Sequence, residues 1–259
     1  MTQARPLNAS SRNSSAFAER SHAARNPLRT NADSRTLRTL SISALRLDGS
    51  FQHSEVKVPA IPEFDATFAA FTSGTLLQGE STRIAIEDLQ PGQYLQTVTG
   101  DLAQVMWIGS SIVIPNDAIA PMPLIRVMAD SFGVGRPDAF VTTGPAARVL
   151  QTPQDLRANQ DGAQMLASLA AFEDGVNVIR LMPPTPVELF HLCLDKHAVI
   201  NAGGLQTESY YPDIPALQKL PTPMQALHNA LFPHIRRLSD FGALTCVRAP
   251  AHSTDQTAA

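Results

Sequence analysis

The chain has 259 residues, enough for one domain of ordinary size with additional arms, and its 44% hydrophobic content is typical of soluble globular proteins. No apolar run approaches the roughly 20 residues that a membrane-spanning helix needs. The sequence contains no P-loop, Rossmann glycine pattern, HExxH or CxxC motif, which excludes the common nucleotide-binding and zinc enzymes.

Charge is distributed unevenly along the chain. Residues 1–50 hold eight arginines against three acidic residues, a charge of +5, so the net charge of −3 leaves −8 for the remainder. Because these arginines are spread singly rather than clustered, we do not expect nucleic-acid binding. Recruitment to an acidic protein partner is the alternative that this asymmetry leaves open.

Residues 1–62 are expected to form a disordered basic arm and linker. Ser, Asn, Arg and Ala dominate the first 50 positions without a sustained repeat, and such a segment cannot bury enough apolar surface to offset its ordering entropy. The prolines of Val56–Pro62 mark a linker. The start lacks the apolar segment of a secretory signal peptide, so a cytoplasmic location is expected, although its arginine and serine content also fits a transit peptide.

From about Phe68 the sequence consists of short apolar runs divided by turn residues, which predicts an all-β fold. Asp88–Gly92 places Pro and Gly where a tight turn needs them. The expected strands are 75–77, 84–89, 94–98, 105–109, 111–114, 124–128, 139–143, 148–150, 177–181 and 189–194.

Two helices are expected beside these strands. A small one is predicted around Gln164–Phe172. The apolar residues of Met224–Leu238 recur at a spacing of three to four, which predicts an amphipathic helix that Pro233 kinks or restarts. We therefore place a β domain at residues 63–213, followed at 214–259 by a C-terminal amphipathic helix and a flexible tail that frays from residue 249.

The organising stretch lies between Ala70 and Gly109. It contains Ala70-Phe71-Thr72-Ser73-Gly74-Thr75, then Glu87-Asp88-Leu89-Gln90-Pro91-Gly92, then Trp107-Ile108-Gly109. This order resembles the opening of bacterial Hint (Hedgehog/intein) domains, with Cys-Phe-x-x-Gly-Thr, Glu-Asp-Leu-x-Pro-Gly-Asp and Trp-Ile-Gly. The resemblance extends over about residues 66–213. It implies an all-β Hint fold of short curved strands in two pseudo-two-fold-related subdomains.

The resemblance also implies where self-cleavage chemistry would lie. In this family the first residue of the domain, a Cys, attacks the carbonyl before it, but Ala70 has neither sulfur nor oxygen to attack with. Thr72 and Ser73 are the nearby hydroxyls that could stand in. Each would need the peptide to shift, and a shift of about 1 Å can already cost 10²-fold in rate.

A second block, Gly144-Pro145-Ala146-Ala147-Arg148, resembles the family's Ser/Thr-Pro-x-His-Arg, whose His polarises the scissile amide. Pro145 and Arg148 are present, but the His position is Ala147 and the Ser/Thr position is Gly144. Thr143 and its neighbour Thr142 are the hydroxyls closest to this block. Losing nucleophile and helper together indicates that the chemistry is gone, because such partners act as a unit.

The third block runs from Glu188 to Pro212 and resembles the family's Tyr-x-His-Leu-Leu-Leu-Asp-Arg-His and Glu-Ser-Phe-x-Pro. His191, Asp195 and His197 could be acid–base groups, or the two histidines a metal site. Six positions along a straight strand separate the histidines by roughly 20 Å, so chelation would need a bend near Asp195. We favour structural histidines that bond the backbone, and expect no metal and no cofactor.

Cys193 and Cys246 are the only cysteines, too few for a disulfide framework, so a reducing compartment is the expected setting. Cys193 lies between two leucines and is interpreted as a small buried hydrophobe rather than a nucleophile.

The sequence thus predicts a degenerate Hint domain, without self-cleavage or splicing, retained as a structural or binding module. Two alternatives remain at this point. One is an active self-cleaving domain that uses Thr72 or Ser73. The other is a β-rich adaptor whose arginine-rich arm binds an acidic partner.

Overall fold

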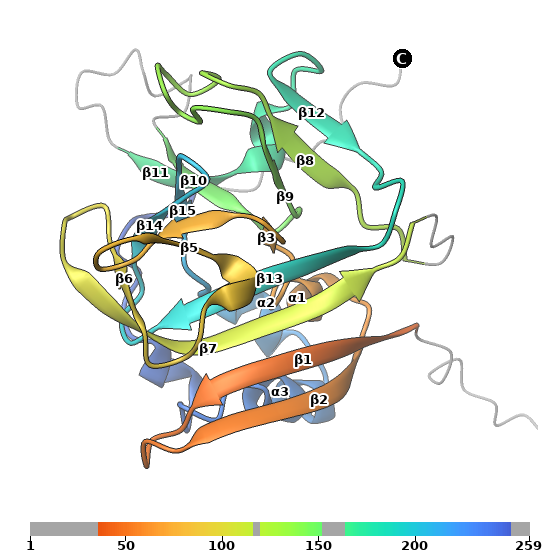
Figure 1. The fold of residues 1–259 in the computed structure, drawn as a ribbon. Helices are drawn as coiled ribbons and strands as arrows, with labels where there is room; N and C mark the ends of the chain where they lie inside the picture. The colour runs from red at the N-terminus through yellow and green to blue at the C-terminus, as the bar shows by residue number, and fades with distance from the viewer. Residues whose placement is uncertain (1–35, 116–119, 152–163, 250–259) are drawn as a thin grey trace, which may run out of the picture. The chain divides into compact units, whose positions relative to one another are not determined.

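The computed structural model describes residues 36–115, 120–151 and 164–249, and its architecture is built from antiparallel strands (Figure 1). One sheet has nine strands in the order β12-β8-β9-β3-β13-β7-β1-β2, with β6 also pairing with β7. Their bounds are β12 Val178–Leu181, β8 Leu124–Val127, β9 Val141–Thr143, β3 Phe71–Thr72, β13 Val187–Leu194, β7 Leu102–Val113, β1 Leu37–Leu45, β2 Phe51–Pro59 and β6 Tyr94–Gln96.

The second sheet has six strands in the order β11-β10-β15-β14-β4-β5. Their bounds are β11 Met165–Ser168, β10 Arg148–Gln151, β15 Leu205–Glu208, β14 Val199–Ala202, β4 Leu76–Gln78 and β5 Arg83–Ala85. Short helices complete the described part: α1 Pro62–Asp65, α2 Ile214–Gln218 and α3 Thr222–Ala230, with 3-10 turns at Ile86–Asp88, Leu169–Phe172 and Leu238–Phe241. No helix in the described ranges is both long and apolar enough to cross a membrane.

Trp107 on β7 joins the central strands to the C-terminal segment. β7 pairs with β13 from Val113↔Val187 to Trp107↔Cys193, and the Trp107 side chain is fully buried. Its indole N–H donates a hydrogen bond of 2.7 Å to the carbonyl of Leu231, and its ring lies 4.6 Å from that of Phe232. A buried indole that finds such a partner keeps its apolar burial without losing a hydrogen bond. The residues after α3 are therefore part of the core.

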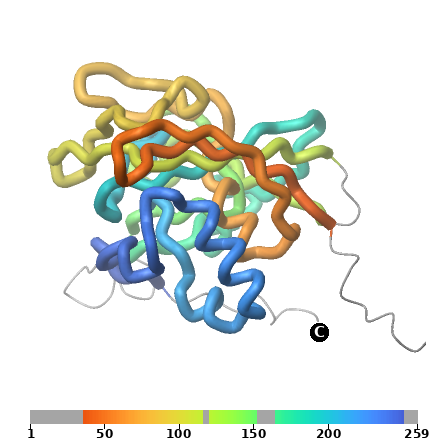
Figure 2. The backbone as a smooth tube through the Cα atoms, turned by 90° about the horizontal axis from the view of Figure 1, so that it is seen from below, coloured from red at the N-terminus to blue at the C-terminus, as the bar shows by residue number. Residues whose placement is uncertain are grey.

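The expected disorder of residues 1–62 is wrong for residues 37–59, which form the β1–β2 hairpin. Leu40, Ile42 and Ala44 are buried in alternation with polar residues, and β1 pairs with β7. Figure 2 shows the orange hairpin running beside the blue C-terminal helices, against which its apolar side packs. The serine- and arginine-rich composition concealed a repeat of two. Residues 1–35 lie outside the described residues.

Three smaller predictions also need correction. The small helix expected around Gln164–Phe172 is strand β11 followed by a 3-10 turn, since this segment pairs with β10. The two strands expected at 105–109 and 111–114 are one strand, β7, which continues through Gly109. A side chain at Gly109 would meet the Trp107 ring at 2.2 Å, so this glycine allows the tryptophan to fold over its own strand.

The C-terminal helix is also shorter than expected, because α3 ends at Ala230 and does not reach Leu238. Pro233 follows soon after, and its ring and missing N–H oppose a continued helix. The last part of the expected tail, residues 250–259, lies outside the described residues.

Replacing Ile42 by alanine tests whether the hairpin belongs to the folded core. Ile42 is 1% exposed, so Ile42→Ala should lower the free energy of unfolding by about 2–5 kcal/mol, the usual cost of such a cavity. Thr39→Ala, at an exposed position of the same strand, should change it by no more than about 0.5 kcal/mol. Urea denaturation measures both, and equal small effects would contradict a core role.

Candidate functional site

Strand β3 carries residue 70 into the middle of the nine-stranded sheet. The Ala70 N–H donates to the carbonyl of Phe190 at 3.1 Å, and the Ala70 carbonyl accepts from the Gly144 N–H at 3.0 Å. The carbonyl of Ala69 accepts from the Ala146 N–H at 2.8 Å. The structure therefore brings together the two blocks that the sequence marked as nucleophile and helper positions.

Gly144 allows these two blocks to approach closely. A Cβ atom at this position would lie 2.2 Å from the carbonyl oxygen of Ala69 and 2.5 Å from its carbon. Real side chains do not tolerate such distances to backbone atoms, so a serine or threonine here would force the chains apart. The close approach of the two blocks therefore requires glycine at position 144.

Ala70 and Ala147 are both part of a closed hydrophobic cluster. Ala70 is 1% exposed and Ala147 is 2% exposed, and Phe71, Leu169 and Phe190 belong to the same cluster. Core packing in proteins is tight, so a larger side chain at either position would have to displace its apolar neighbours. Both positions are therefore buried, and neither side chain carries a reactive atom.

His191 lies beside this cluster and is completely buried among aromatic rings. Its ring meets Phe71 edge-on at 5.5 Å and Tyr210 at 5.3 Å. The Leu192 N–H donates to its Nδ1 at 3.1 Å. Burial lowers the pKa of His191 to about 3, so the imidazole is neutral at physiological pH. Its contacts are those of a packed side chain that bonds the backbone.

His197 and Asp195 lie beyond the end of β13 and have separate partners. The Thr245 N–H donates to Nδ1 of His197 at 3.0 Å, so the imidazole proton is on Nε2, which donates to Glu208 at 3.0 Å. The Thr245 hydroxyl also donates to the carbonyl of His197. Asp195 accepts from the backbone N–H groups of Gln104 and Lys196. These contacts fix the turn, and the structure gives the two histidines no shared ligand geometry.

The hydroxyls of Thr72 and Thr143 are both engaged by backbone carbonyls of the sheet. Thr72 donates to the carbonyl of Thr142 at 2.9 Å, and Thr143 donates to that of Ile125 at 3.4 Å. Thr72 and the exposed Ser73 line a cavity of their own. None of the residues that line it also lines the cavity beside Ala69, which is described below.

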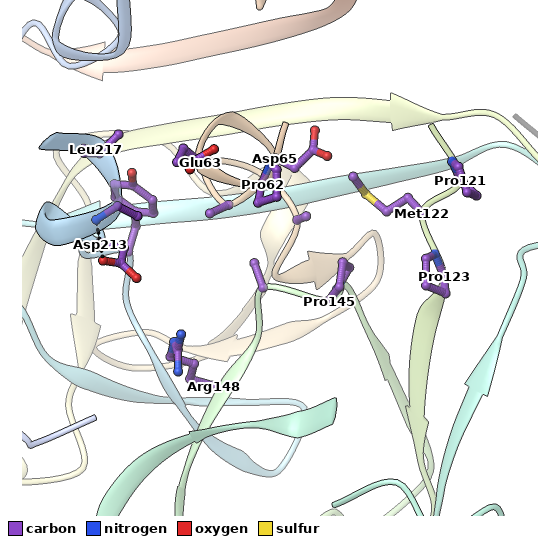
Figure 3. Close-up of a pocket in the computed structure, with 15 residues that line it drawn as sticks. Pro62, Glu63, Asp65, Pro121, Met122, Pro123, Pro145, Arg148, Asp213 and Leu217 are labelled. Carbon is purple, nitrogen blue, oxygen red and sulfur yellow. Dashed lines mark hydrogen bonds between the residues drawn. The ribbon is translucent and has the colours of Figure 1, made fainter. Parts of the chain in front are cut away.

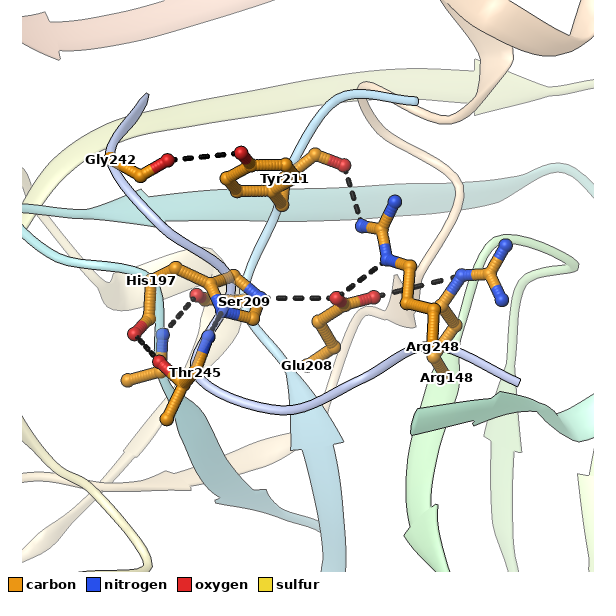
Figure 4. A network of polar contacts seen from close by, with 9 residues as sticks. Arg148, His197, Glu208, Ser209, Tyr211, Gly242, Thr245 and Arg248 are labelled. Atoms are coloured by element: carbon orange, nitrogen blue, oxygen red, sulfur yellow. Dashed lines mark hydrogen bonds and ion pairs between the residues drawn. The ribbon is translucent and has the colours of Figure 1, made fainter. Parts of the chain in front are cut away.

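A buried ion-pair network centred on Glu208 was not anticipated from the sequence (Figure 4). Glu208 is 4% exposed, and it accepts from Nε of Arg248 at 2.8 Å and from His197, with Nε of Arg148 at 3.6 Å. Burial alone raises the pKa of Glu208, but the bond from His197 and the charge of Arg248 outweigh burial and hold that pKa below its ordinary value. Arg248 also donates to the carbonyl of Tyr211, which fastens the C-terminal segment to β15.

An open cavity of about 400 Å³ adjoins the Ala69–Ala70 peptide (Figure 3). Its walls are mainly apolar, with four prolines and several alanines, and four charged side chains approach it. The charged residues are Glu63, Asp65, Arg148 and Asp213; the remaining lining residues are Pro62, Ala66, Ala69, Pro121, Met122, Pro123, Pro145, Ala146, Tyr210, Ala216 and Leu217.

Asp65 is a carboxylate of the cavity wall whose acidity is shifted by burial. Burial raises its pKa to about 6, even though the Arg38 guanidinium lies 3.0 Å away and opposes that shift. Arg38 comes from β1, so the hairpin contributes to the electrostatics of this cavity. An apolar hollow with a few convergent polar groups and a shifted pKa is the usual form of a ligand site.

The cysteines and metal-binding residue types add no further centre in the described ranges. Cys193 and Cys246 are both free, and burial raises the pKa of each thiol. Within the same ranges, no group of three or more His, Cys, Asp and Glu side chains is placed to hold a metal ion.

Comparison with protein families identifies the domain. The model of the Hint domain matches residues 69–214, more than half of the chain. The chain belongs to the Hint domain family. The matched range begins at the peptide that Gly144 and Ala146 hold, and the described strands agree with the all-β Hint fold that the sequence predicted.

One solved structure was also found to be similar. The solution structure of a bacterial intein-like domain from Clostridium thermocellum shares 10% sequence identity and a TM-score of 0.39. The alignment covers 55% of this chain and 99% of that domain. The comparison with curated proteins found no match.

Neutralising Glu208 tests whether its buried ion-pair network stabilises this Hint domain. Glu208→Gln leaves two arginines without their buried carboxylate and should lower the free energy of unfolding by about 3–5 kcal/mol. Glu173→Gln is the matched control, since its pair with Arg180, whose side chain is 55% exposed, should contribute about 0–1 kcal/mol. Chemical denaturation compares the two, and equal losses would show that the network adds nothing beyond a surface pair.

Proposed function

We propose that this Hint domain does not cleave itself and serves as a binding module, with its ligand site in the cavity beside Ala69 and Ala146. The observation that carries the proposal is the packing around residue 70. The peptide that the family's chemistry would break has its backbone groups bonded within the sheet, and the adjoining Ala70 and Ala147 side chains are sealed in the core.

Inactivity follows here from space as well as from residue type. Cleavage needs an attacking atom and a proton donor placed within hydrogen-bond distance of the peptide. A thiol at 70 and an imidazole at 147 would both add volume to a filled cluster, and overpacking of this kind typically costs about 1–3 kcal/mol. A side chain at Gly144 would collide with Ala69. Three positions therefore oppose the reaction together.

Cleavage by a displaced hydroxyl finds less support. The Thr72 hydroxyl is engaged with Thr142, and Phe71, whose carbonyl it would attack, pairs in the sheet with both Phe190 and Thr143. Recruitment through the arginine-rich arm depends chiefly on residues 1–35, which lie outside the described residues, and it stays a prediction.

Incubation of the full chain with dithiothreitol or hydroxylamine tests the loss of self-cleavage. The expected result is an intact chain of 27.9 kDa at all times. Detection must be by mass spectrometry under denaturing conditions, because β1 pairs with β7 and would hold an N-terminal fragment in place after a cut.

The contrary outcome is a fragment that begins near Ala70 or Thr72 and accumulates with time. Ala70→Cys is the informative comparison variant. If the folded Ala70→Cys variant remains intact, packing around residue 70 also opposes cleavage. If this variant cleaves, the wild-type chain lacks only the nucleophile.

The lining of the cavity favours a ligand with an apolar body and a positive charge. Three carboxylates and one guanidinium line it. The guanidinium of Arg148 faces Glu208, and Asp65 is paired with Arg38. Glu63 and Asp213 have no ion pair among the described residues, so the cavity retains negative charge. A lysine or arginine beside an apolar side chain of a partner protein has this chemistry.

Two matched small probes test the cavity by nuclear magnetic resonance. Hexylammonium should shift the backbone amide signals of Ala69, Ala146 and Ala216, and hexanoate, with the same chain and opposite charge, should shift them less. Glu63→Gln should weaken hexylammonium binding about two- to fivefold, the effect of one exposed ion pair. Ala216→Phe should prevent the shifts by filling the cavity.

Equal binding of the two probes would show that the charge assignment is wrong. Unchanged binding to Ala216→Phe would place the ligand elsewhere.

A further inference from the structure

Strand β2 is a free edge of the nine-stranded sheet. It spans nine residues and pairs on one side with β1, and in the described ranges no strand pairs with its other side. Its side chains alternate between exposed and partly buried from Phe51 to Lys57 without a bulge in its pairing to β1. A long regular edge of this kind is able to pair with another strand.

The hairpin register decides which backbone groups face outward. The Arg46 N–H donates to Ser50, and the Ala60 N–H donates to Thr36, so the even-numbered residues of β2 bond to β1. Along antiparallel strands, hydrogen-bonded residue pairs alternate with pairs that are not hydrogen-bonded to each other. The N–H and C=O groups of the odd-numbered residues, including Glu55 and Lys57, therefore point to the free edge.

The same two residues carry opposite charges on one face of the strand. Glu55 and Lys57 are both exposed, and neither forms an ion pair among the described residues. If two copies of β2 pair antiparallel about a two-fold axis at Val56, Glu55 of each lies opposite Lys57 of the other. Both residues are odd-numbered, so their backbone groups also meet in a hydrogen-bonded pair.

Other two-fold registers lose this match. An axis at Glu55 places two carboxylates opposite each other, and an axis at Lys57 places two ammonium groups together, which is destabilising. An axis at Ser54 places Glu55 opposite His53 but leaves Lys57 opposite Phe51, so the lysine has no acidic partner. A shift by one residue pairs outward with inward side chains. The charge pattern of β2 is complementary to itself in one register.

We propose that β2 pairs with β2 of a second copy of this chain, antiparallel and about an axis at Val56, so that the sheet continues across a symmetric dimer. In a two-fold interface each contact occurs twice, so the Glu55–Lys57 pair is formed twice. Pro59 lacks an N–H, and its carbonyl already accepts from Ile61, which ends the ladder at that side. The contact is short, and we expect a reversible dimer.

Charge reversal on the full chain tests the dimer by sedimentation velocity over a wide range of concentration. Glu55→Lys and Lys57→Glu should each raise the dimer dissociation constant about tenfold or more, because two attractive pairs become repulsive. The double variant restores both pairs and should dimerise like the wild type. An equimolar mixture of the two single variants should form heterodimers, since each supplies the charges that the other lacks.

Glu80→Lys, at an exposed position away from β2, controls for the change in net charge and should leave the dimer intact. Thermal unfolding verifies that all variants fold, since both positions are exposed. A wild-type chain that is monomeric throughout overturns the proposal. So do single variants that dimerise like the wild type, or a mixture that dimerises no better than its components.

Discussion

The close approach of Ala69 and Ala70 to Gly144 and Ala146 is the constraint on which the described structure depends. Strand β3 has only two residues, yet it pairs with β13 on one side and with β9 on the other. Ala70, which precedes it, also donates a hydrogen bond to Phe190 on β13. Gly144 is what permits the short distance, because a side chain there would collide with Ala69. This contact aligns the long central strands with the shorter strands beyond β9.

The same contact supports the proposal that this Hint domain does not cleave itself. Self-cleavage needs an attacking atom and a proton donor within hydrogen-bond distance of the peptide. Around residue 70 the backbone groups are hydrogen-bonded, and the buried side chains of Ala70 and Ala147 supply neither an attacking atom nor a proton donor. Ala69 and Ala146 also line the cavity, so the proposed ligand site adjoins this contact.

The features of the structure that could be predicted from the sequence are those that depend on local patterns and on motif spacing. Strands β8 and β12 and the meeting of residues 70 and 144–147 follow from apolar runs and from motif order. The β1–β2 hairpin was missed because the buried face of β1 includes Arg38 and its outward positions include Leu37 and Leu45 beside serine and threonine, which hides the alternation. The burial of β1 also depends on β7, far along the chain. The Glu208–Arg248 pair was invisible for the same reason, since 40 residues separate the partners and a tertiary crossing brings them together.

The segments on either side of the residues that match the Hint family contribute buried side chains to the core. The described residues form one compact unit, although the match to the Hint family covers only residues 69–214. Trp107 belongs to the matched part, yet its hydrogen bond goes to Leu231 and its ring packs on Phe232, both beyond it. On the other side, β1 adds its buried residues to the same cluster. A cut before Ala70 would therefore leave the β1–β2 hairpin paired with β7, so the two pieces would stay associated through the sheet.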